Sequence, residues 1–202
     1  MTAAADNRVY LASRSPRRRE LLAQIRIAFE ELPLGEHVVD ETPHAGELPG
    51  AYVERVARAK AEAGWQLVVA RRLPRLPVLA ADTTVVLAGE ILGKPDDNAH
   101  ARRMLERLSG ATHEVLTAVA VAQDTRIATA LSASTVEFRE LDGAEIRRYV
   151  ATGEPLDKAG AYAIQGRAAV FARAIRGSYS GIVGLPLYET AGLLREFGVA
   201  PI

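Results

Sequence analysis

The chain has 202 residues, of which 49% are hydrophobic and 25% charged. This ordinary globular composition excludes a disordered or fibrous protein, and at roughly 150 residues per domain the length suits a single domain over residues 1–202. The 25 lysines and arginines balance the 25 aspartates and glutamates, so no overall field attracts nucleic acid or an anionic membrane. We therefore expect neither as a partner.

The absence of cysteine excludes disulfides, thiolate nucleophiles and cysteine metal sites. The first residues, MTAAADNRVYLAS, contain a short apolar stretch with no basic region before it. They predict neither a signal peptide nor a membrane span. Both observations favour the cytoplasm.

A strand and a helix joined by a basic loop are predicted at the N-terminus. Residues 8–12 form a short apolar strand, and Ser15 before Pro16 marks a helix start with Ser15 as its N-cap. The serine hydroxyls, Arg17, Arg18 and the unpaired N–H groups of the first turn suit a polyphosphate. The alternative is a solvated basic turn with a serine cap. No Walker A or G-x-G-x-x-G motif occurs, which argues against P-loop NTPases and dinucleotide dehydrogenases.

The centre of the chain predicts helices that alternate with hairpins. A helix over 51–68 precedes the most apolar β-branched run, 78–88, which enters a hairpin, and a second helix follows over 98–109. Two longer strands over 113–123 and 126–138 pair as another hairpin. Because hairpins alternate with helices, we expect a mixed rather than a purely parallel sheet.

Two acidic positions are candidates for holding Mg²⁺ or orienting a water molecule. Asp82 follows Val78–Ala81, where we expect a strand to leave the core, and that end of an open α/β sheet binds ligands. Asp40 and Glu41 lie in the proline- and glycine-rich loop over 33–50. The alternatives are a turn cap made by Asp82 with Thr83 and a merely solvated acidic loop. The histidines lack metal-site spacing and receive no role: His37, His44, His100 and His113.

The C-terminal part predicts a helix, a loop, a strand and a final helix, over residues 142–151, 154–166, 168–176 and 186–197. The loop is dense in glycine yet places Tyr162 and Gln165 in apolar surroundings. A glutamine amide both donates and accepts, so it can bind the edge of a nucleotide base. The alternative is a structural turn that crosses the sheet.

Lysine is rare in this chain, since 22 of the 25 cations are arginines. The three lysines, Lys60, Lys94 and Lys158, therefore stand out as candidates for binding or catalysis. The alternative is that they are ordinary surface charges, because exposed lysine is the commonest kind.

Eight motifs occur in order: LASRSPRRRELL, Asp40–Glu41, Lys60 in ARAKA, AADTTV, GKP, SGATHEVLTAVAV, GEPLDKAGAYAIQG and VGLPLYET. Together, from about Tyr10 to Phe197, they resemble the Maf family of nucleoside triphosphate pyrophosphatases. The resemblance implies a mixed, elongated β-sheet flanked by helices, with two lobes around a deep nucleotide-binding cleft, similar to inosine triphosphate pyrophosphatase. It also implies hydrolysis of the α–β phosphoanhydride with Mg²⁺ or Mn²⁺, and a homodimer. The GEPLDKAGAYAIQG form looks like the branch that acts on dTTP and UTP.

The resemblance also assigns roles to residues. Asp82 matches the proton acceptor, and the positions linked to substrate choice are Arg17, Thr83 and Gln165. We expect Glu41, Lys60 and Lys94 to act with Asp82 in catalysis. Substrate binding falls to Ser15, Arg17, Arg18, Thr83, Lys158, Tyr162 and Gln165. Glu41 and Asp82 form the expected metal pair, and which of them is the base stays open; Lys158 has the alternative role of fixing its own loop. One departure is Arg14, where the family often has glycine or glutamine.

Two other functions compete with this one. A nucleotidyltransferase would need a second substrate and a glycine-rich first loop, and this loop has no glycine. A non-catalytic nucleotide-sensing regulator of septum formation would bind a nucleotide without turnover, and the presence of all the carboxylates and lysines argues against it. Within the pyrophosphatase hypothesis, modified pyrimidine nucleotides are a further substrate class.

Overall fold

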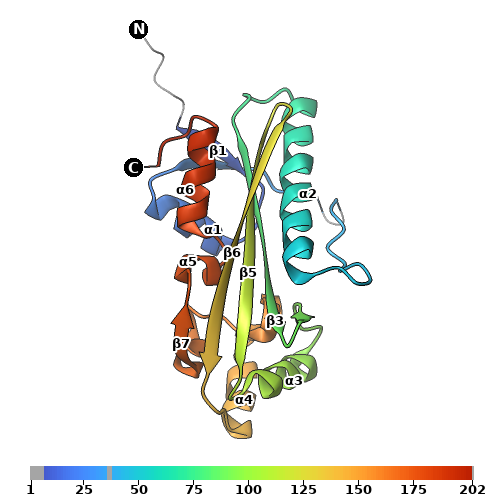
Figure 1. The fold of residues 1–202 in the computed structure, drawn as a ribbon, viewed down its shortest axis with the longest axis vertical. Coiled ribbons are helices and arrows are strands. Elements are labelled where there is room, and N and C mark those ends of the chain that lie inside the picture. Colours follow the sequence, from blue (N-terminus) through green and yellow to red (C-terminus); the bar gives the residue numbers. More distant parts are fainter. Residues whose placement is uncertain (1–6, 36–37, 202) are drawn as a thin grey trace.

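A computed structural model describes residues 7–35 and 38–201 (Figure 1). In this part of the chain seven strands form one sheet in the order β2-β1-β3-β5-β6-β7, with β4 paired to β3. β1 is parallel to β2 and β3, and the other pairs are antiparallel, which confirms the mixed sheet. The strands are β1 Arg8–Leu11, β2 Ala28–Glu31, β3 Val78–Leu87, β4 Glu90–Leu92, β5 Thr112–Gln123, β6 Arg126–Phe138 and β7 Ala172–Arg176.

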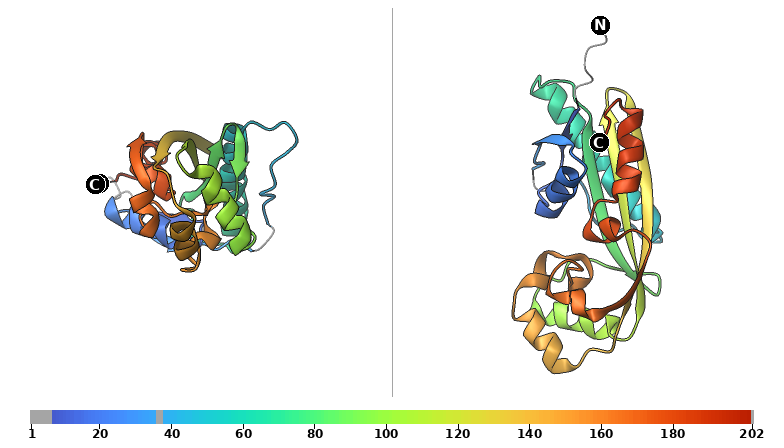
Figure 2. Two further views of the ribbon diagram at one scale, coloured as in Figure 1. Left: turned by 90° about the horizontal axis from the view of Figure 1, so that it is seen from below. Right: turned by 90° about the vertical axis from the view of Figure 1, so that its left-hand side faces the viewer.

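Helices cover both faces of the sheet. They are α1 Pro16–Gln24, α2 Pro49–Ala70, α3 Asn98–Leu108, α4 Gly143–Val150, α5 Tyr179–Val183 and α6 Leu187–Glu196, with 3₁₀ turns η1 Glu154–Asp157, η2 Ala159–Ala161 and η3 Arg167–Phe171. α2 packs on one face of the upper sheet, while α1 and α6 pack on the other (Figures 1 and 2). The lower lobe contains α3, α4 and the 3₁₀ turns, and the long strands β5 and β6 extend into it (Figure 2). Within the described residues no helix is long and apolar enough to cross a membrane.

The alternation of side chains along β3 sends two polar residues to opposite sides of the sheet. Val78 and Ala80 belong to the core under α2, whereas Leu79 and Ala81 belong to the core under α1 and α6. Successive strand residues face opposite sides, so Asp82 lies on the α2 side of the sheet and Thr83 lies on the α1 side. β3 therefore supplies one polar side chain to the α2 face of the sheet and one to the face covered by α1 and α6.

Close packing of α2 on the sheet depends on Gly64, where a Cβ would lie 2.7 Å from Val78 Cγ1 and 3.3 Å from Ala12 Cβ. We expect Gly64→Ala to lower the free energy of unfolding by about 1–3 kcal/mol, because this overpacking outweighs the helix propensity of alanine. Gly192 in α6 has open space around its Cβ position, so Gly192→Ala should stabilise the protein slightly. Urea unfolding of both variants tests this, and stabilisation by both would contradict it.

Most elements predicted from the sequence are confirmed, with three exceptions. β2 was not predicted, because AFEE is largely exposed and has no apolar alternation. Residues 168–171 form η3 rather than strand, since the buried Ala168 and Phe171 follow a three-residue period. The short helix α5 was also not predicted; Ser178 caps it by accepting a hydrogen bond from Gly181 N at 3.0 Å.

Candidate active site

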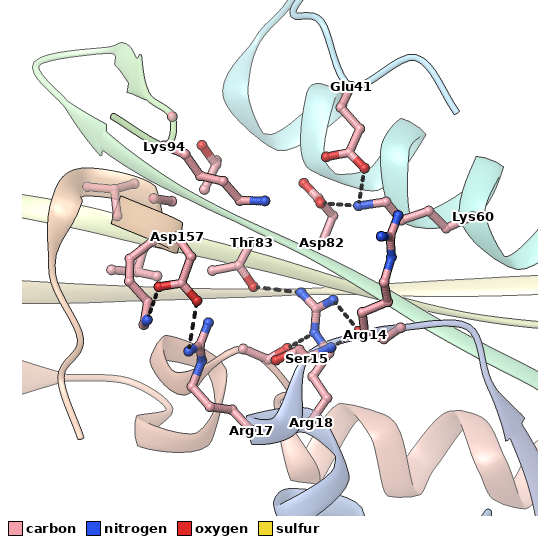
Figure 3. Close-up of a pocket in the computed structure, with 18 of the residues that line it drawn as sticks. Arg14, Ser15, Arg17, Arg18, Glu41, Lys60, Asp82, Thr83, Lys94 and Asp157 are labelled. Carbon is pink, nitrogen blue, oxygen red and sulfur yellow. Dashed lines mark hydrogen bonds and ion pairs between the residues drawn. The ribbon is translucent and has the colours of Figure 1, made fainter. Parts of the chain in front are cut away.

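A cleft of about 1270 Å³ is lined by residues of both lobes. This volume is generous for a nucleotide-sized ligand. Figure 3 shows that side chains from α1, α2, β3 and the turn after β4 point into it. All eleven residues expected at the site line this cleft: Ser15, Arg17, Arg18, Glu41, Lys60, Asp82, Thr83, Lys94, Lys158, Tyr162 and Gln165. Segments far apart in the sequence thus meet in one place.

The start of α1 presents backbone N–H groups and cations to the cleft. Ser15 is the N-cap residue, as expected, but its side chain makes no capping hydrogen bond. Ser15 N instead donates to the Ser13 hydroxyl at 3.2 Å. The first turn contains no acidic residue to offset the helix dipole. It contains instead Arg17, whose positive charge is unfavourable at this end of a helix and whose guanidinium lies 3.9 Å from the Asp157 carboxylate. An anionic ligand at the start of α1 would offset both the helix dipole and the positive charge of the arginines there.

Arg18 joins three segments at the floor of the cleft. Its guanidinium donates to the Gly184 carbonyl at 2.8 Å, the Ser13 hydroxyl at 3.1 Å and the Thr83 hydroxyl at 3.4 Å. Thr117 Oγ1 lies 2.9 Å from Thr83 Oγ1 and continues this network into β5. Burial lowers the pKa of Arg18, although the charges of the acidic residues nearby oppose this. The three hydrogen bonds hold the guanidinium in a fixed orientation.

Lys60 on α2 holds the two candidate carboxylates together (Figure 3). Its Nζ lies 2.8 Å from Asp82 Oδ1 and 2.9 Å from Glu41 Oε1. Burial would raise the pKa of Glu41, but the hydrogen bond and charge of Lys60, with smaller effects of Lys94 and Arg18, lower it below its ordinary value. Glu41 is thus held ionised next to Asp82.

Asp82 does not lie where the sequence placed it. It was expected just beyond the end of a strand, or in a turn cap with Thr83, but β3 continues through it to Leu87, and Asp82 is in register with Ala118 of β5. The β-branched residues after it extend the strand into the hairpin with β4. Asp82 is only 8% exposed, so the middle of a strand rather than its end brings the carboxylate to the cleft.

The other two lysines differ in their surroundings. Lys94 is exposed and makes no hydrogen bond or ion pair with another described residue, so its ammonium is available to a ligand. Lys158 pairs with the neighbouring Asp157 and donates to the Glu154 carbonyl at 3.4 Å. These contacts are those of a residue that fixes its own loop.

Tyr162 and Gln165 face different environments. The Tyr162 hydroxyl lies 2.8 Å from His113 Nε2, and its ring packs edge-on against Phe138, so its polar end points into the core of the lower lobe. Burial lowers the pKa of His113 to about 4, so this histidine is neutral and structural rather than incidental. Gln165 is exposed at the cleft. His37 lies outside the described residues.

Several residues of the site gave no functional signal in the sequence. Asp157 had no assigned role, yet it contacts both Arg17 and the neighbouring lysine. Tyr52 had no assigned role either, but its hydroxyl donates to the Glu41 carbonyl at 2.9 Å. Arg55, one turn further along α2, bonds to the same loop. The i, i+3 spacing of these two residues places them on neighbouring parts of one helix face.

Comparison with known proteins identifies the family of this chain. A family model described as Maf-like protein matches residues 8–197. The chain belongs to the Maf family. A dTTP/UTP pyrophosphatase of Aromatoleum aromaticum is 59% identical over 197 residues, which cover 95% of this chain and 96% of that protein. One of Dechloromonas aromatica is 54% identical over 200 residues, covering 96% and 100%.

The fold of this Maf family member also resembles solved structures of proteins with low sequence identity to it. The structure of a HAM1 protein from Coxiella burnetii is 18% identical and superposes with a TM-score of 0.51, covering 94% of this chain and 98% of that one. The Ham1 protein of Staphylococcus aureus gives a TM-score of 0.50 at 16% identity. At such low identity the likeness concerns the fold alone, and it confirms the expected fold class.

Proposed function

We propose that this protein is a nucleoside triphosphate pyrophosphatase that hydrolyses dTTP and UTP to the monophosphate and pyrophosphate. The observation that carries the proposal is the sorting of charge in the cleft, with the cationic start of α1 on one side of β3 and the Glu41–Lys60–Asp82 cluster on the other. The names of the relatives, at 53–59% identity, support the substrate class.

The cations of the cleft bind the triphosphate. The N–H groups of α1 and the hydroxyl of Ser15 contact one part of it, while Arg17 and Arg18 supply guanidinium groups. Lys60 and Lys94 stabilise the negative charge that develops on the departing pyrophosphate, usually the largest contribution to catalysis in such transfers. Gln165 and Thr83 contact the nucleoside, and the Tyr162 ring borders it.

Glu41 and Asp82 fit a divalent cation. Their oxygens converge on one point, since both lie within 2.9 Å of Lys60 Nζ, which itself is a cation. No group of three or more acidic or histidine side chains suited to a metal occurs in the described residues. Two carboxylates with phosphate oxygens completing the coordination are a usual arrangement for Mg²⁺, and Mn²⁺ has similar preferences. When bound, the metal would neutralise phosphate charge, and the Glu41–Asp82 pair supplies the base that takes the proton of the attacking water.

Because β5 and β6 extend through both lobes, we propose that residues 1–202 act as a single domain. A cytoplasmic homodimer remains our prediction for its state in the cell.

Product analysis with a panel of common and modified nucleoside triphosphates tests the proposed function. With Mg²⁺ or Mn²⁺ present, dTTP and UTP should give monophosphate and pyrophosphate. Release of orthophosphate would contradict the proposal, and transfer of the nucleotide to a second substrate would indicate a nucleotidyltransferase. Tight dTTP binding without hydrolysis, whichever divalent metal ion is added, would favour the nucleotide-sensing regulator of septum formation instead.

A further inference from the structure

One arginine of α2, Arg55, makes four hydrogen bonds to the acidic loop that carries Glu41. The Arg55 guanidinium donates to both oxygens of the Glu47 carboxylate, at 2.6 and 2.9 Å. It also donates to the carbonyls of Asp40 at 3.1 Å and Thr42 at 2.9 Å. Hydrogen bonds from Arg55, and then from His44 N, lower the pKa of Glu47 to about 2. Arg55 therefore holds this loop at residues 40–42 and again at Glu47.

The two carbonyls that Arg55 binds are those on either side of Glu41. The Glu41 carbonyl between them accepts a hydrogen bond from the Tyr52 hydroxyl at 2.9 Å. Two side chains of α2 thus bind three consecutive carbonyls, and Lys60 of the same helix receives the Glu41 carboxylate. The backbone of Glu41 is fixed to the helix that also supplies the partner of its side chain.

The position of the Glu41 carboxylate depends on this backbone attachment. Its side chain is 51% exposed and is therefore poorly fixed by packing of its own. The loop over 33–50 contains four acidic residues and no lysine or arginine, so it has no strong cation of its own to oppose the repulsion between them. The required positive charge comes from α2, through Arg55 for Glu47 and Lys60 for Glu41.

We propose that Arg55, assisted by Tyr52, is a positioning residue for the reaction: it holds the backbone of residues 40–42 so that Glu41 reaches the metal and Asp82. The inference rests on the proposed pyrophosphatase function. A guanidinium suits this task because it makes several hydrogen bonds in fixed directions, which a lysine ammonium does not. Loss of Arg55 should leave Asp82 and the phosphate-binding cations in place and affect chiefly the step that depends on Glu41.

The variants Arg55→Gln and Arg55→Lys test this role. Arg55→Gln should raise the Mg²⁺ concentration for half-maximal activity by about tenfold, which is the effect expected from losing charge-assisted hydrogen bonds, while KM for dTTP changes little. Arg55→Lys should recover part of the loss. Arg58 is the matched control, because it lies on the same helix and, among the described residues, pairs only with Glu62 at 3.0 Å. Arg58→Gln should behave as wild type.

A double-mutant cycle separates positioning from general stabilisation. If Arg55 acts through Glu41, then Arg55→Gln adds no further loss in an enzyme that already carries Glu41→Gln. Independent, multiplying losses would overturn the inference, as would an unchanged Mg²⁺ requirement in a folded Arg55→Gln variant. If that variant does not fold, Tyr52→Phe removes one of the carbonyl contacts and should shift the Mg²⁺ requirement in the same direction.

Two measurements do not depend on turnover. Hydrogen exchange should show faster exchange of the amides of residues 40–47 in Arg55→Gln and no change in Arg58→Gln. Mn²⁺ titration followed by electron paramagnetic resonance, with a non-hydrolysable dTTP analogue present, should show weaker binding to Arg55→Gln. If wild type releases no pyrophosphate, the proposed function fails. If wild type is active and both measurements leave Arg55→Gln unchanged, only this inference fails.

Discussion

Asp82→Asn should lower kcat for pyrophosphate release by about a thousandfold while leaving the fold intact. Asparagine has nearly the same size, and its amide oxygen still accepts the hydrogen bond that Lys60 now gives to Asp82 at 2.8 Å. Lys60 is the one hydrogen-bond partner of the Asp82 carboxylate among the described residues, so this substitution disturbs no other polar contact. What the amide lacks is the charge to bind a cation and the basicity to take a proton from water.

The kinetics of this variant also distinguish the two possible roles of Asp82. If Asp82 is the base, the loss persists at saturating metal; if it is chiefly a ligand, high Mg²⁺ recovers much of the rate. Asp124→Asn is the matched control, since Asp124 lies in the β5–β6 turn at φ 55°, a conformation that asparagine tolerates. Activity of Asp82→Asn close to that of this control would exclude Asp82 from the chemistry.

The sequence predicted the parts of the fold that have a strong hydrophobic pattern. The hairpins of β3 with β4 and of β5 with β6 were expected because β3, β5 and β6 are long and rich in apolar and β-branched residues. β2 has four residues with one partly buried, and its place beside β1 depends on a parallel pairing formed after α1. Local periodicity contains no information about such a pairing, so β2 could not be predicted.

The candidate site was predictable in its residues but not in its contacts. Ordered motifs indicated the polar side chains that the cleft collects. They did not show that Asp82 lies within a strand, or that Lys60 lies between two carboxylates. The attachments of Arg55 and Tyr52 were invisible because their acceptors include backbone carbonyls, which every residue has. Contacts of this kind depend on tertiary structure alone.

Arg18→Met should lower kcat/KM for dTTP by about a hundredfold, the loss expected when a fixed cationic donor to the developing charge is removed. It should also lower the free energy of unfolding by about 1–3 kcal/mol, because the Gly184 carbonyl and the Ser13 hydroxyl lose a partly buried, charged donor. Methionine retains the aliphatic volume of arginine, so the change removes the guanidinium without opening a large cavity. Steady-state kinetics and urea unfolding measure the two effects separately.

Arg18→Lys and Arg19→Met show which property of Arg18 matters. A lysine restores the charge but not the planar fork that binds Gly184, Ser13 and Thr83 together. We therefore expect it to recover part of the activity and little of the stability. Arg19 follows directly in α1 but forms an exposed pair with Glu31, and its replacement should change neither quantity appreciably. If Arg18→Met is less stable but keeps the wild-type kcat/KM, then Arg18 only stabilises the structure at the base of the cleft. Arg17 and Lys94 would then be the residues that bind the phosphates.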